Sequence, residues 1–320
     1  MNVLMDTGGG PRAGIGHVLR SLALARRLRS LRMGVRLAAE PPDVPLVRRA
    51  RRQAGVSVLS SARWRPNVVV VDRPDPSAPG LTALHRRWPS ARLVALDYYG
   101  PSVPALAATV NLNAARKAAG DRRVQRSGLR YAIIRESFRA ARRLTGRSRA
   151  GVRSVYVGFG GTDPHGWSLA AVRALTTVLP KGATIHLVVG QRPVEPMPAG
   201  ARVRLHVAVG DPSRLLAASD FAVIGGGTML IEAACVGVPA IVVPRTRLER
   251  IFSREFVDAG AAKLIPVGRA FPARGVAKQA AAILRTPATR RRMRAAGRRL
   301  VDGRGVARIA ALVQAAGGAR

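Results

Sequence analysis

The segment Phe221–Pro244, with the sequence FAVIGGGTMLIEAACVGVPAIVVP, decides the fold class. It predicts an apolar strand over Phe221–Ile224, then three glycines, then a helix that begins at Thr228 and ends at Gly237. A second apolar strand is predicted over Ala240–Val243. A strand, a tight turn, a helix and a further strand form the repeating unit of an α/β protein with a parallel sheet.

The glycines Gly225, Gly226 and Gly227 predict a loop that binds an anion. Because they lack Cβ, an anion can approach their backbone, and the helix after them points its unpaired N–H groups and positive dipole end toward it. Thr228 is the expected N-cap, and Glu232 lies one turn further, where a carboxylate can accept hydrogen bonds from a ribose. The pattern predicts a nucleoside diphosphate site. The alternative is that the glycines serve only the packing of strand and helix.

The first half of the chain begins with the same pattern of strand, glycine-rich loop and helix. Asn2–Met5 predicts a buried strand, and the loop after it leads through Gly14 and Gly16 to His17. An imidazole at the start of a helix can reach over the edge of the sheet, and the helix N-terminus favours its neutral, proton-accepting form. His17 is therefore a candidate general base toward water or an alcohol. A histidine that only caps the helix is the alternative.

Polar residues also follow later strands of the first half. Asp72 ends a run of four valines, Asp97 follows the strand predicted over Arg92–Leu96, and Asn113 follows a brief third strand. The carboxyl ends of parallel strands form the edge at which α/β domains bind ligands. For each acid, capping of the following turn is the expected role, and catalysis is the alternative. Asp97 and Asn113 are included among the candidate substrate-binding residues.

A second glycine loop, GFGGTDP over 158–164, opens the second half of the chain. Gly160, Gly161 and the hydroxyl of Thr162 are expected at the same sheet edge as the triple glycine, so that two loops could hold a pyrophosphate from both sides. The restart of the pattern predicts two Rossmann-like domains with a ligand cleft between them. The expected boundaries are 1–146 for the N-terminal domain and 152–287 for the nucleotide-binding domain, with C-terminal helices over 288–320 that could pack back on the N-terminal domain.

Composition and motifs exclude several classes of protein. The chain has 320 residues, a hydrophobic content of 48% and one cysteine, Cys235, so we expect two cored domains, no disulfide and a reducing, cytoplasmic location. The apolar N-terminal run is too short for a secretory signal, and no run reaches the length of a membrane span. The chain contains no Cys/His cluster, no H-E-x-x-H, no G-x-S-x-G and no G-x-x-x-x-G-K-[ST], so a zinc site, serine hydrolysis and P-loop phosphoryl transfer are not expected.

The net charge of +37 comes from 54 basic residues, of which four are lysines and 50 are arginines. Abundant Arg, Ala, Gly and Pro with few Lys is typical of a GC-rich coding sequence, whatever the protein binds. Attraction to an anionic membrane surface or to nucleic acid is the functional alternative. The arginines are scattered and lack interleaved aromatic residues, so we expect no specific nucleic-acid partner.

Several motifs together resemble a known family. The chain is similar to the sugar-nucleotide hydrolases of pseudaminic acid biosynthesis and to the spore-coat polysaccharide glycosyltransferases, and its second half also resembles the lipid-linked GlcNAc transferase of peptidoglycan synthesis. The motifs that carry the resemblance are GIGHVLR (14–20), GLRYAIIRESF (128–138), GFGGTDP (158–164), IGGGTMLIEAACVGVPAIVVP (224–244) and DGRG (302–305).

The resemblance implies a GT-B architecture, in which two Rossmann-like domains hold a UDP-sugar. It implies that Glu232 binds the ribose, that Gly225–Thr228 and Gly160–Thr162 surround the diphosphate, and that neither a metal nor a further cofactor takes part. In the hydrolases the histidine matching His17 activates water for attack on the anomeric carbon and displacement of UDP. In a transferase the same histidine would lie beside the acceptor hydroxyl. Gly14, Gly16 and Arg20 belong to the same motif and are candidate substrate-binding residues.

One stretch departs from the family. After the strand that ends at Pro244, relatives carry Asn or Gln side chains that hold the donor sugar, whereas this chain has RTRLERIF over 245–252. Glu249 and Arg250 are the candidate replacements, which leaves the sugar open.

The expected function is that of a UDP-sugar-dependent enzyme of surface polysaccharide or nonulosonic acid biosynthesis, which releases UDP by hydrolysis. Transfer of the sugar to an acceptor hydroxyl is the close alternative. A non-catalytic nucleotide-sugar-binding protein and a basic protein associated with nucleic acid are alternatives of other classes. The expected partner is a nucleotide sugar, and association with a membrane or another acidic surface through the arginines stays open.

Overall fold

The computed structural model divides the chain into two compact units. Unit 1 comprises Met1–Arg135 together with Gly303–Arg320, and unit 2 comprises Glu136–Asp302. Each unit is described by itself. The structure describes residues 1–8, 15–39, 43, 45–61, 63–112, 125–144, 151–160, 163, 165–190, 202–268 and 270–318.

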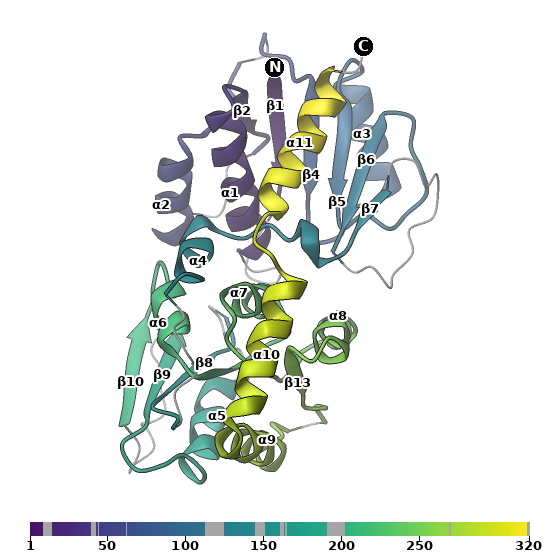
Figure 1. Ribbon diagram of the computed structural model, residues 1–320. Helices are drawn as coiled ribbons and strands as arrows, with labels where there is room; N and C mark the ends of the chain where they lie inside the picture. The colour runs from purple at the N-terminus through teal and green to yellow at the C-terminus, as the bar shows by residue number, and fades with distance from the viewer. Residues whose placement is uncertain are drawn as a thin grey trace. The chain divides into compact units, whose positions relative to one another are not determined.

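Unit 1 is built on a seven-stranded parallel sheet with the strand order β3-β2-β1-β4-β5-β6-β7 (Figure 1). Its strands are β1 (Asn2–Thr7), β2 (Gly34–Leu37), β3 (Ser57–Val58), β4 (Val68–Asp72), β5 (Arg92–Leu96), β6 (Leu106–Asn111) and β7 (Gln125–Ser127). The order reverses direction between β1 and β4, which is where ligands bind in doubly wound sheets. Every residue of β4 is buried, as expected for a central strand that is covered on both faces.

Helices cover both faces of this sheet. The helices of unit 1 are α1 (Gly16–Ser30), α2 (Pro45–Ala54), α3 (Ala78–Arg87) and α11 (Gly305–Gly318), with the 3-10 turn η2 at Leu129–Tyr131. Leu22 of α1 and Ile309 of α11 lie in one core cluster, together with every second residue of the strands. Leu81 of α3 lies in a second cluster, together with the strand residues between them. The alternation of side chains along each strand therefore supplies two separate cores.

The last helix, α11, lies across the strands of unit 1 although it is the C-terminal segment of the chain (Figure 1). Ile309 and Val313 are fully buried there, and burial of such a side chain stabilises a fold by about 1.5–3 kcal/mol. A Cβ on Gly305 would lie 2.1 Å from the carbonyl oxygen of Ala132, so only glycine allows α11 to begin against this backbone.

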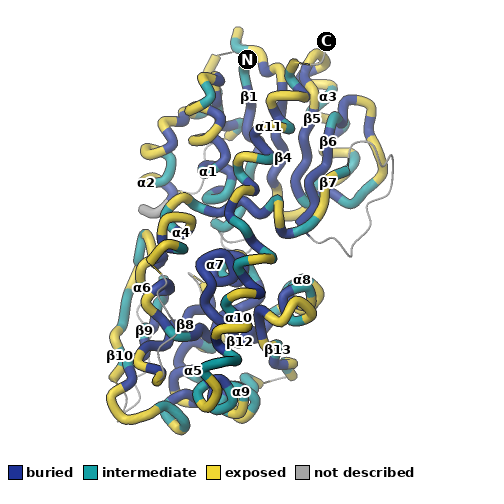
Figure 2. Tube along the Cα trace, viewed as in Figure 1, coloured by how far each residue is buried: buried dark blue, intermediate teal, exposed yellow. Residues whose placement is uncertain are grey.

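Unit 2 is built on a six-stranded parallel sheet with the order β10-β9-β8-β11-β12-β13. Its strands are β8 (Ser154–Gly158), β9 (Thr184–Val189), β10 (Arg202–Val207), β11 (Phe221–Ile224), β12 (Ala240–Val242) and β13 (Ala262–Leu264). Its helices are α4 (Glu136–Ala141), α5 (Trp167–Thr176), α6 (Ser213–Ala218), α7 (Thr228–Val236), α8 (Arg247–Asp258), α9 (Ala273–Arg285) and α10 (Pro287–Leu300). The central strands are buried, whereas the edge strand β10 is partly exposed (Figure 2). The predicted α/β class with two doubly wound parallel sheets is confirmed.

The observed division differs from the expected domain boundaries of 1–146, 152–287 and 288–320. Helix α4 packs on α6 and α7 and belongs to unit 2, and α10 packs on α7 and also belongs to unit 2. Helix α11 belongs to unit 1, in line with the expectation that C-terminal helices could pack back on the N-terminal domain. The polar segment 145–150, expected as a linker, lies outside the described residues.

Three arginines of unit 2 bind the carbonyl end of α7. Arg142, Arg298 and Arg294 donate hydrogen bonds of 2.8, 3.2 and 3.1 Å to successive carbonyl oxygens of Cys235–Gly237. Cationic groups at a helix C-terminus satisfy its unpaired carbonyls and interact favourably with its dipole. Part of the arginine excess therefore has a structural role, independent of any anionic partner.

No helix within the described part of the chain is both long enough and apolar enough to cross a membrane.

Candidate functional site

In unit 1 a polar cluster lies at the carboxyl edge of the sheet, where β4 faces the first turns of α1. Gly16 begins α1, which places His17, Arg20 and Ser21 on the side of the helix that contacts β4. Their spacing of three and four residues puts them on one helix face. Asp72 is the last residue of β4, and its side chain is fully buried beneath them.

His17 and Asp72 form a hydrogen-bonded pair, with 2.8 Å between His17 Nδ1 and Asp72 Oδ1. Because an ionised carboxylate can only accept, this contact is a hydrogen bond when Nδ1 carries the proton, and in the neutral ring the lone pair is then on Nε2. The His17 side chain is 24% exposed while that of Asp72 is 0% exposed, so the acid is hidden and the imidazole can be reached. A buried carboxylate that orients a histidine is the arrangement of an activated general base.

Arg20 and Ser21 also bind the Asp72 carboxylate. Arg20 Nε lies 2.9 Å from both oxygens of Asp72, and Ser21 Oγ donates to Oδ2 at 2.7 Å. Burial alone would raise the pKa of the Asp72 carboxyl, but the charge of Arg20 and the hydrogen bonds from His17 and Arg20 hold that pKa well below its ordinary value. Asp72 is therefore ionised throughout the neutral range. The expectation that Asp72 caps the following turn is wrong, because its oxygens bind side chains of α1 instead.

Asp97 joins the same cluster and also binds the backbone directly after β6. Its Oδ2 lies 3.0 Å from Arg20 Nη1, and its Oδ1 accepts a hydrogen bond of 2.9 Å from the backbone N–H of Leu112. Burial opposes the charge of Arg20, yet Asp72 and Asp97 raise the pKa of its guanidinium above the ordinary value. Asp97 has a φ of 53°, a left-handed conformation that only a few non-glycine residues adopt. Two sets of contacts hold it there, one with Arg20 and one with the backbone of Leu112. Its partner is not the turn that follows Asp97, and its role toward a substrate stays a prediction.

The glycine loop of unit 2, Gly225–Gly227, connects β11 to α7. Thr228 is the first residue of α7 and Gly227 is the N-cap, without a capping side chain, so the prediction that Thr228 is the N-cap is wrong. The first N–H groups of α7 consequently receive no hydrogen bond from the N-cap side chain. The helix ends as predicted at Gly237, which has a φ of 89°.

The three glycines have different surroundings. A Cβ on Gly226 would lie 2.7 Å from Ser253 Oγ and 2.9 Å from Glu249 Cβ, so Gly226 is required by the packing of α8. The nearest atoms to a Cβ on Gly225 and on Gly227 would lie at 3.6 and 3.9 Å, which is ordinary contact. The packing alternative thus accounts for Gly226 but not for its two neighbours.

Glu249 and Arg250, the candidate sugar-binding residues, lie on α8 in different surroundings. Glu249 is held over the glycine loop, since its Oε2 accepts hydrogen bonds from the backbone N–H groups of Gly226 at 3.3 Å and Arg245 at 2.7 Å. Arg250 is exposed. Only Glu249 is therefore joined to the predicted anion loop. Arg245, which the sequence motifs did not single out, lies beside it.

Glu232 is placed one turn into α7, as predicted, but it is only 2% exposed. Its contact with a ribose stays a prediction. Cys235, one turn further on, is buried, and burial raises the pKa of its thiol to about 11. The thiol is protonated at neutral pH and is not a nucleophile.

The remaining candidate residues fall into two groups. Gly160 has a φ of 91°, which favours glycine, and lies at the end of the segment described after β8. Gly14, Asn113, Gly161 and Thr162 lie outside the described residues. Within the described part of the chain, no three His, Cys, Asp or Glu side chains come together as a metal site.

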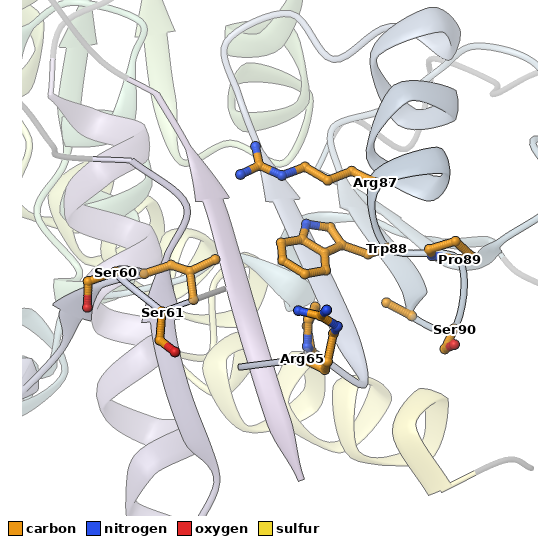
Figure 3. A pocket seen from close by; sticks show the side chains of 10 residues that line it. Ser60, Ser61, Arg65, Arg87, Trp88, Pro89 and Ser90 are labelled. Carbon is orange, nitrogen blue, oxygen red and sulfur yellow. The ribbon is translucent and has the colours of Figure 1, made fainter. Parts of the chain in front are cut away.

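A hollow of about 690 Å³ lies on unit 1, away from the polar cluster around His17 (Figure 3). Pro66 and Ala91, which line it, precede β4 and β5, whereas Asp72 and Asp97 lie at the opposite ends of these strands. The guanidinium carbons of Arg65 and Arg87 lie 5.8 and 5.4 Å from the centre of the Trp88 ring. The hollow is separate from the His17 cluster.

This chain is similar to known proteins in sequence and in fold. No family model matches it. The spore coat polysaccharide biosynthesis protein SpsG of Bacillus subtilis (strain 168) is 28% identical over 194 residues, which are 58% of this chain and 56% of that protein. MurG of Acinetobacter baumannii matches with a TM-score of 0.67 and 14% identity over 98% of this chain and 99% of that one. The chain has the GT-B fold.

Further GT-B structures give the same result. The spinosyn rhamnosyltransferase SpnG, complexed with thymidine diphosphate, matches with a TM-score of 0.68 and 18% identity over 98% of this chain and 99% of that one. The calicheamicin glycosyltransferase CalG4 matches with a TM-score of 0.68 and 16% identity over 99% of this chain and 98% of that one. The predicted architecture and the predicted relation to the spore-coat polysaccharide proteins are confirmed.

Proposed function

We propose that the chain is an enzyme that transfers the sugar of a nucleotide sugar to an oxygen nucleophile, with His17 as general base. The observation that carries this proposal is the His17–Asp72 pair, with 2.8 Å between Nδ1 and Oδ1 and the Nε2 lone pair left available. The nucleophile loses its proton to Nε2 and attacks the anomeric carbon. The bond from this carbon to the diphosphate oxygen breaks, and its electron pair leaves with the nucleoside diphosphate.

The buried groups around His17 support each stage of this reaction. Asp72 keeps the imidazole in the tautomer that accepts at Nε2, and its negative charge stabilises the imidazolium that forms. Arg20 and Ser21 fix the carboxylate so that it does not reorganise during the reaction. Asp97 in turn positions Arg20, at 3.0 Å. The base is thus preorganised by contacts within unit 1.

Unit 2 is proposed to hold the nucleotide. Gly160, Gly161, Thr162 and Gly225–Thr228 would surround the diphosphate, and Glu232 would bind the ribose. Fixed backbone dipoles at such loops stabilise the charge that develops on a leaving diphosphate. The thymidine diphosphate in the SpnG complex supports a nucleoside diphosphate as ligand. We propose UDP as the nucleotide on the basis of the motif resemblance.

An acceptor hydroxyl is the proposed nucleophile, because SpnG and CalG4, which share the fold, are glycosyltransferases by name. Hydrolysis is the second candidate, favoured by the GIGHVLR motif (14–20), in which His17 would activate water instead. The name of SpsG supports a role in surface polysaccharide synthesis. Nonulosonic acid synthesis, the cytoplasmic location and docking on an acidic surface through the arginines remain predictions.

The test is to follow UDP release from a panel of UDP-sugars, with and without polysaccharide precursors as acceptors. Release that depends on an acceptor supports the transferase, and prompt release without one supports the hydrolase. If nucleoside diphosphates bind but no donor turns over, the chain is a non-catalytic binding protein. RNA or DNA binding that survives 200 mM salt would instead support a nucleic-acid role, since simple charge attraction weakens steeply with salt.

A further inference from the structure

Arg245 follows Pro244, the last of the buried residues that continue from β12. Its side chain lies between the two glycine loops of unit 2. Its Nη1 donates to the carbonyl oxygen of Phe159 at 3.1 Å, directly before Gly160. Its Nη2 donates to Glu249 Oε1 at 2.9 Å. Glu249 Oε2 in turn accepts from Gly226 N–H at 3.3 Å. The Arg245–Glu249 ion pair therefore joins the ends of both loops.

The guanidinium of Arg245 lies close to the glycine backbones. A Cβ on Gly160 would lie 3.9 Å from Arg245 Nη1, and a Cβ on Gly225 would lie 3.6 Å from Arg245 Nε. The positive charge of Arg245 is thus held against the backbone of both loops. A phosphate oxygen bound by the loop amides would lie within the field of this charge.

A further feature of this region is the Nε–H donor of Arg245. This nitrogen is buried and has no hydrogen-bond partner among the residues that the structure describes. Buried donors are almost always paired, and an unpaired one at a functional site calls for a specific explanation. A ligand oxygen between the guanidinium and Gly225 would supply the missing acceptor.

We infer that Arg245 binds the diphosphate of the nucleotide and that Glu249 takes the place of that anion in the unliganded protein. The inference rests on the proposed function and adds to it the residue that neutralises the leaving group. An arginine offers a planar fork of donors and a permanent charge, which suits a diphosphate. Glu249 turns away on binding, because its carboxylate and a phosphate oxygen compete for the same N–H of Gly226.

The experiment is calorimetric titration of the full chain with pyrophosphate, UDP and uridine. We expect Arg245→Gln to weaken pyrophosphate and UDP by about 10- to 100-fold, because a hydrogen-bonded charge is lost, while uridine binds as before. Arg245→Lys keeps the charge without the fork and should bind with intermediate affinity. Arg254→Gln, on an exposed position of the same helix, is the matched control and should bind all three as the wild type does.

Glu249→Gln provides an opposite test. Removal of the competing carboxylate should tighten pyrophosphate binding by about 3- to 10-fold, an estimate based on charge-assisted hydrogen bonds. If Glu249→Gln weakens it as much as Arg245→Gln does, the ion pair only supports the loop and the inference is overturned. Thermal melting followed by circular dichroism shows whether each variant is folded.

The outcomes also separate the inference from the proposed function. Wild-type binding of UDP that Arg245→Gln leaves unchanged overturns the role of Arg245 and leaves the proposed function standing. Equal losses for uridine and UDP in Arg245→Gln also overturn it, since a diphosphate contact cannot weaken uridine. A wild-type chain that binds neither pyrophosphate nor any nucleoside diphosphate overturns both.

Discussion

The polar cluster of unit 1 and the glycine loop of unit 2 are two ways of building a site at the carboxyl edge of a parallel sheet. In unit 1 the proposed working group is the His17 side chain, and its neighbours are paired: Asp72 binds Arg20 and Ser21, and Arg20 also binds Asp97. In unit 2 the proposed working groups are backbone amides, of which that of Gly226 binds Glu249. The proposed base is thus oriented in advance by buried partners, whereas the proposed anion loop is reached by an anion once Glu249 moves away.

The two regions also use arginine differently. Arg20 in unit 1 is paired with carboxylates, while Arg245 in unit 2 has a buried Nε–H that meets no acceptor among the described residues. Arg294 and Arg298, also in unit 2, bind the carbonyl oxygens at the end of α7. The arginines therefore include at least two structural roles, pairing with carboxylates and capping of a helix, so the net charge by itself does not indicate the partner.

The largest effect is expected from removal of the base in unit 1. His17→Ala should lower the rate of UDP release by about 10²- to 10⁴-fold, the usual contribution of a general base. Pyrophosphate and UDP should still bind with wild-type affinity, because their proposed contacts lie in unit 2. Steady-state kinetics and calorimetry on the same preparation measure the two effects. Wild-type turnover in His17→Ala would remove the basis of the proposed mechanism.

Replacement of the orienting acid should come next. Asp72→Asn removes the charge that holds His17 in its proton-accepting tautomer, so the rate should fall by between about 10²- and 10⁴-fold and no further than in His17→Ala. The double variant should lose no more than His17→Ala alone, because both changes disable one unit. Additive losses in the double variant would show that Asp72 acts independently of His17.

The lowered pKa of Asp72 predicts a dependence of stability on pH. A carboxyl whose pKa is lower in the folded than in the unfolded state adds stability above its unfolded pKa of about 3.9, and this stability is lost as the pH falls toward the folded pKa. The free energy of unfolding of the wild type, measured with a denaturant, should thus decrease below about pH 4. Part of this dependence on pH should be absent in Asp72→Asn. An unchanged slope would show that the carboxyl is not coupled to folding.

A smaller effect separates the two functions of the glycine loop. Gly226→Ala should lower the free energy of unfolding by about 1–3 kcal/mol, because its methyl group would clash with α8. Gly225→Ala, with contacts of 3.6 Å or more, should change the free energy of unfolding by about 0.5 kcal/mol or less, yet weaken pyrophosphate binding. Urea unfolding and calorimetry measure the pair. Equal destabilisation by both changes would contradict the distinction.

The smallest effect is expected at the end of α7. Arg298→Gln removes a donor to the carbonyl oxygen of Val236 and a charge at a helix C-terminus, which should cost about 0.3–1 kcal/mol in the free energy of unfolding. Arg291→Gln, on an exposed position of the same helix α10, is the matched control and should cost less. The cost at Arg298 should shrink in high salt. Identical values for both variants would argue against a capping role.

The sequence alone determined the elements that depend on neighbouring residues. The apolar runs predicted β11 before Gly225–Gly227 and β12 after α7. Gly237 predicted the end of α7, and the glycine loop before His17 predicted the position of this histidine at the start of a helix. The motif resemblance predicted the GT-B fold that the known structures confirm. These features follow from local periodicity and backbone preference, which are readable without contacts between distant segments.

Only the tertiary structure decided which side chains meet. Asp72 follows His17 by 55 positions, and both of its expected roles were compatible with the sequence until β4 and α1 were brought together. The same holds for Glu249 on the amide of Gly226, 23 positions away, and for α11 in the core of unit 1. Hydrogen bonds of this kind depend on how strands and helices pack, because a shift of about one residue along a strand would turn Asp72 to the other face of the sheet.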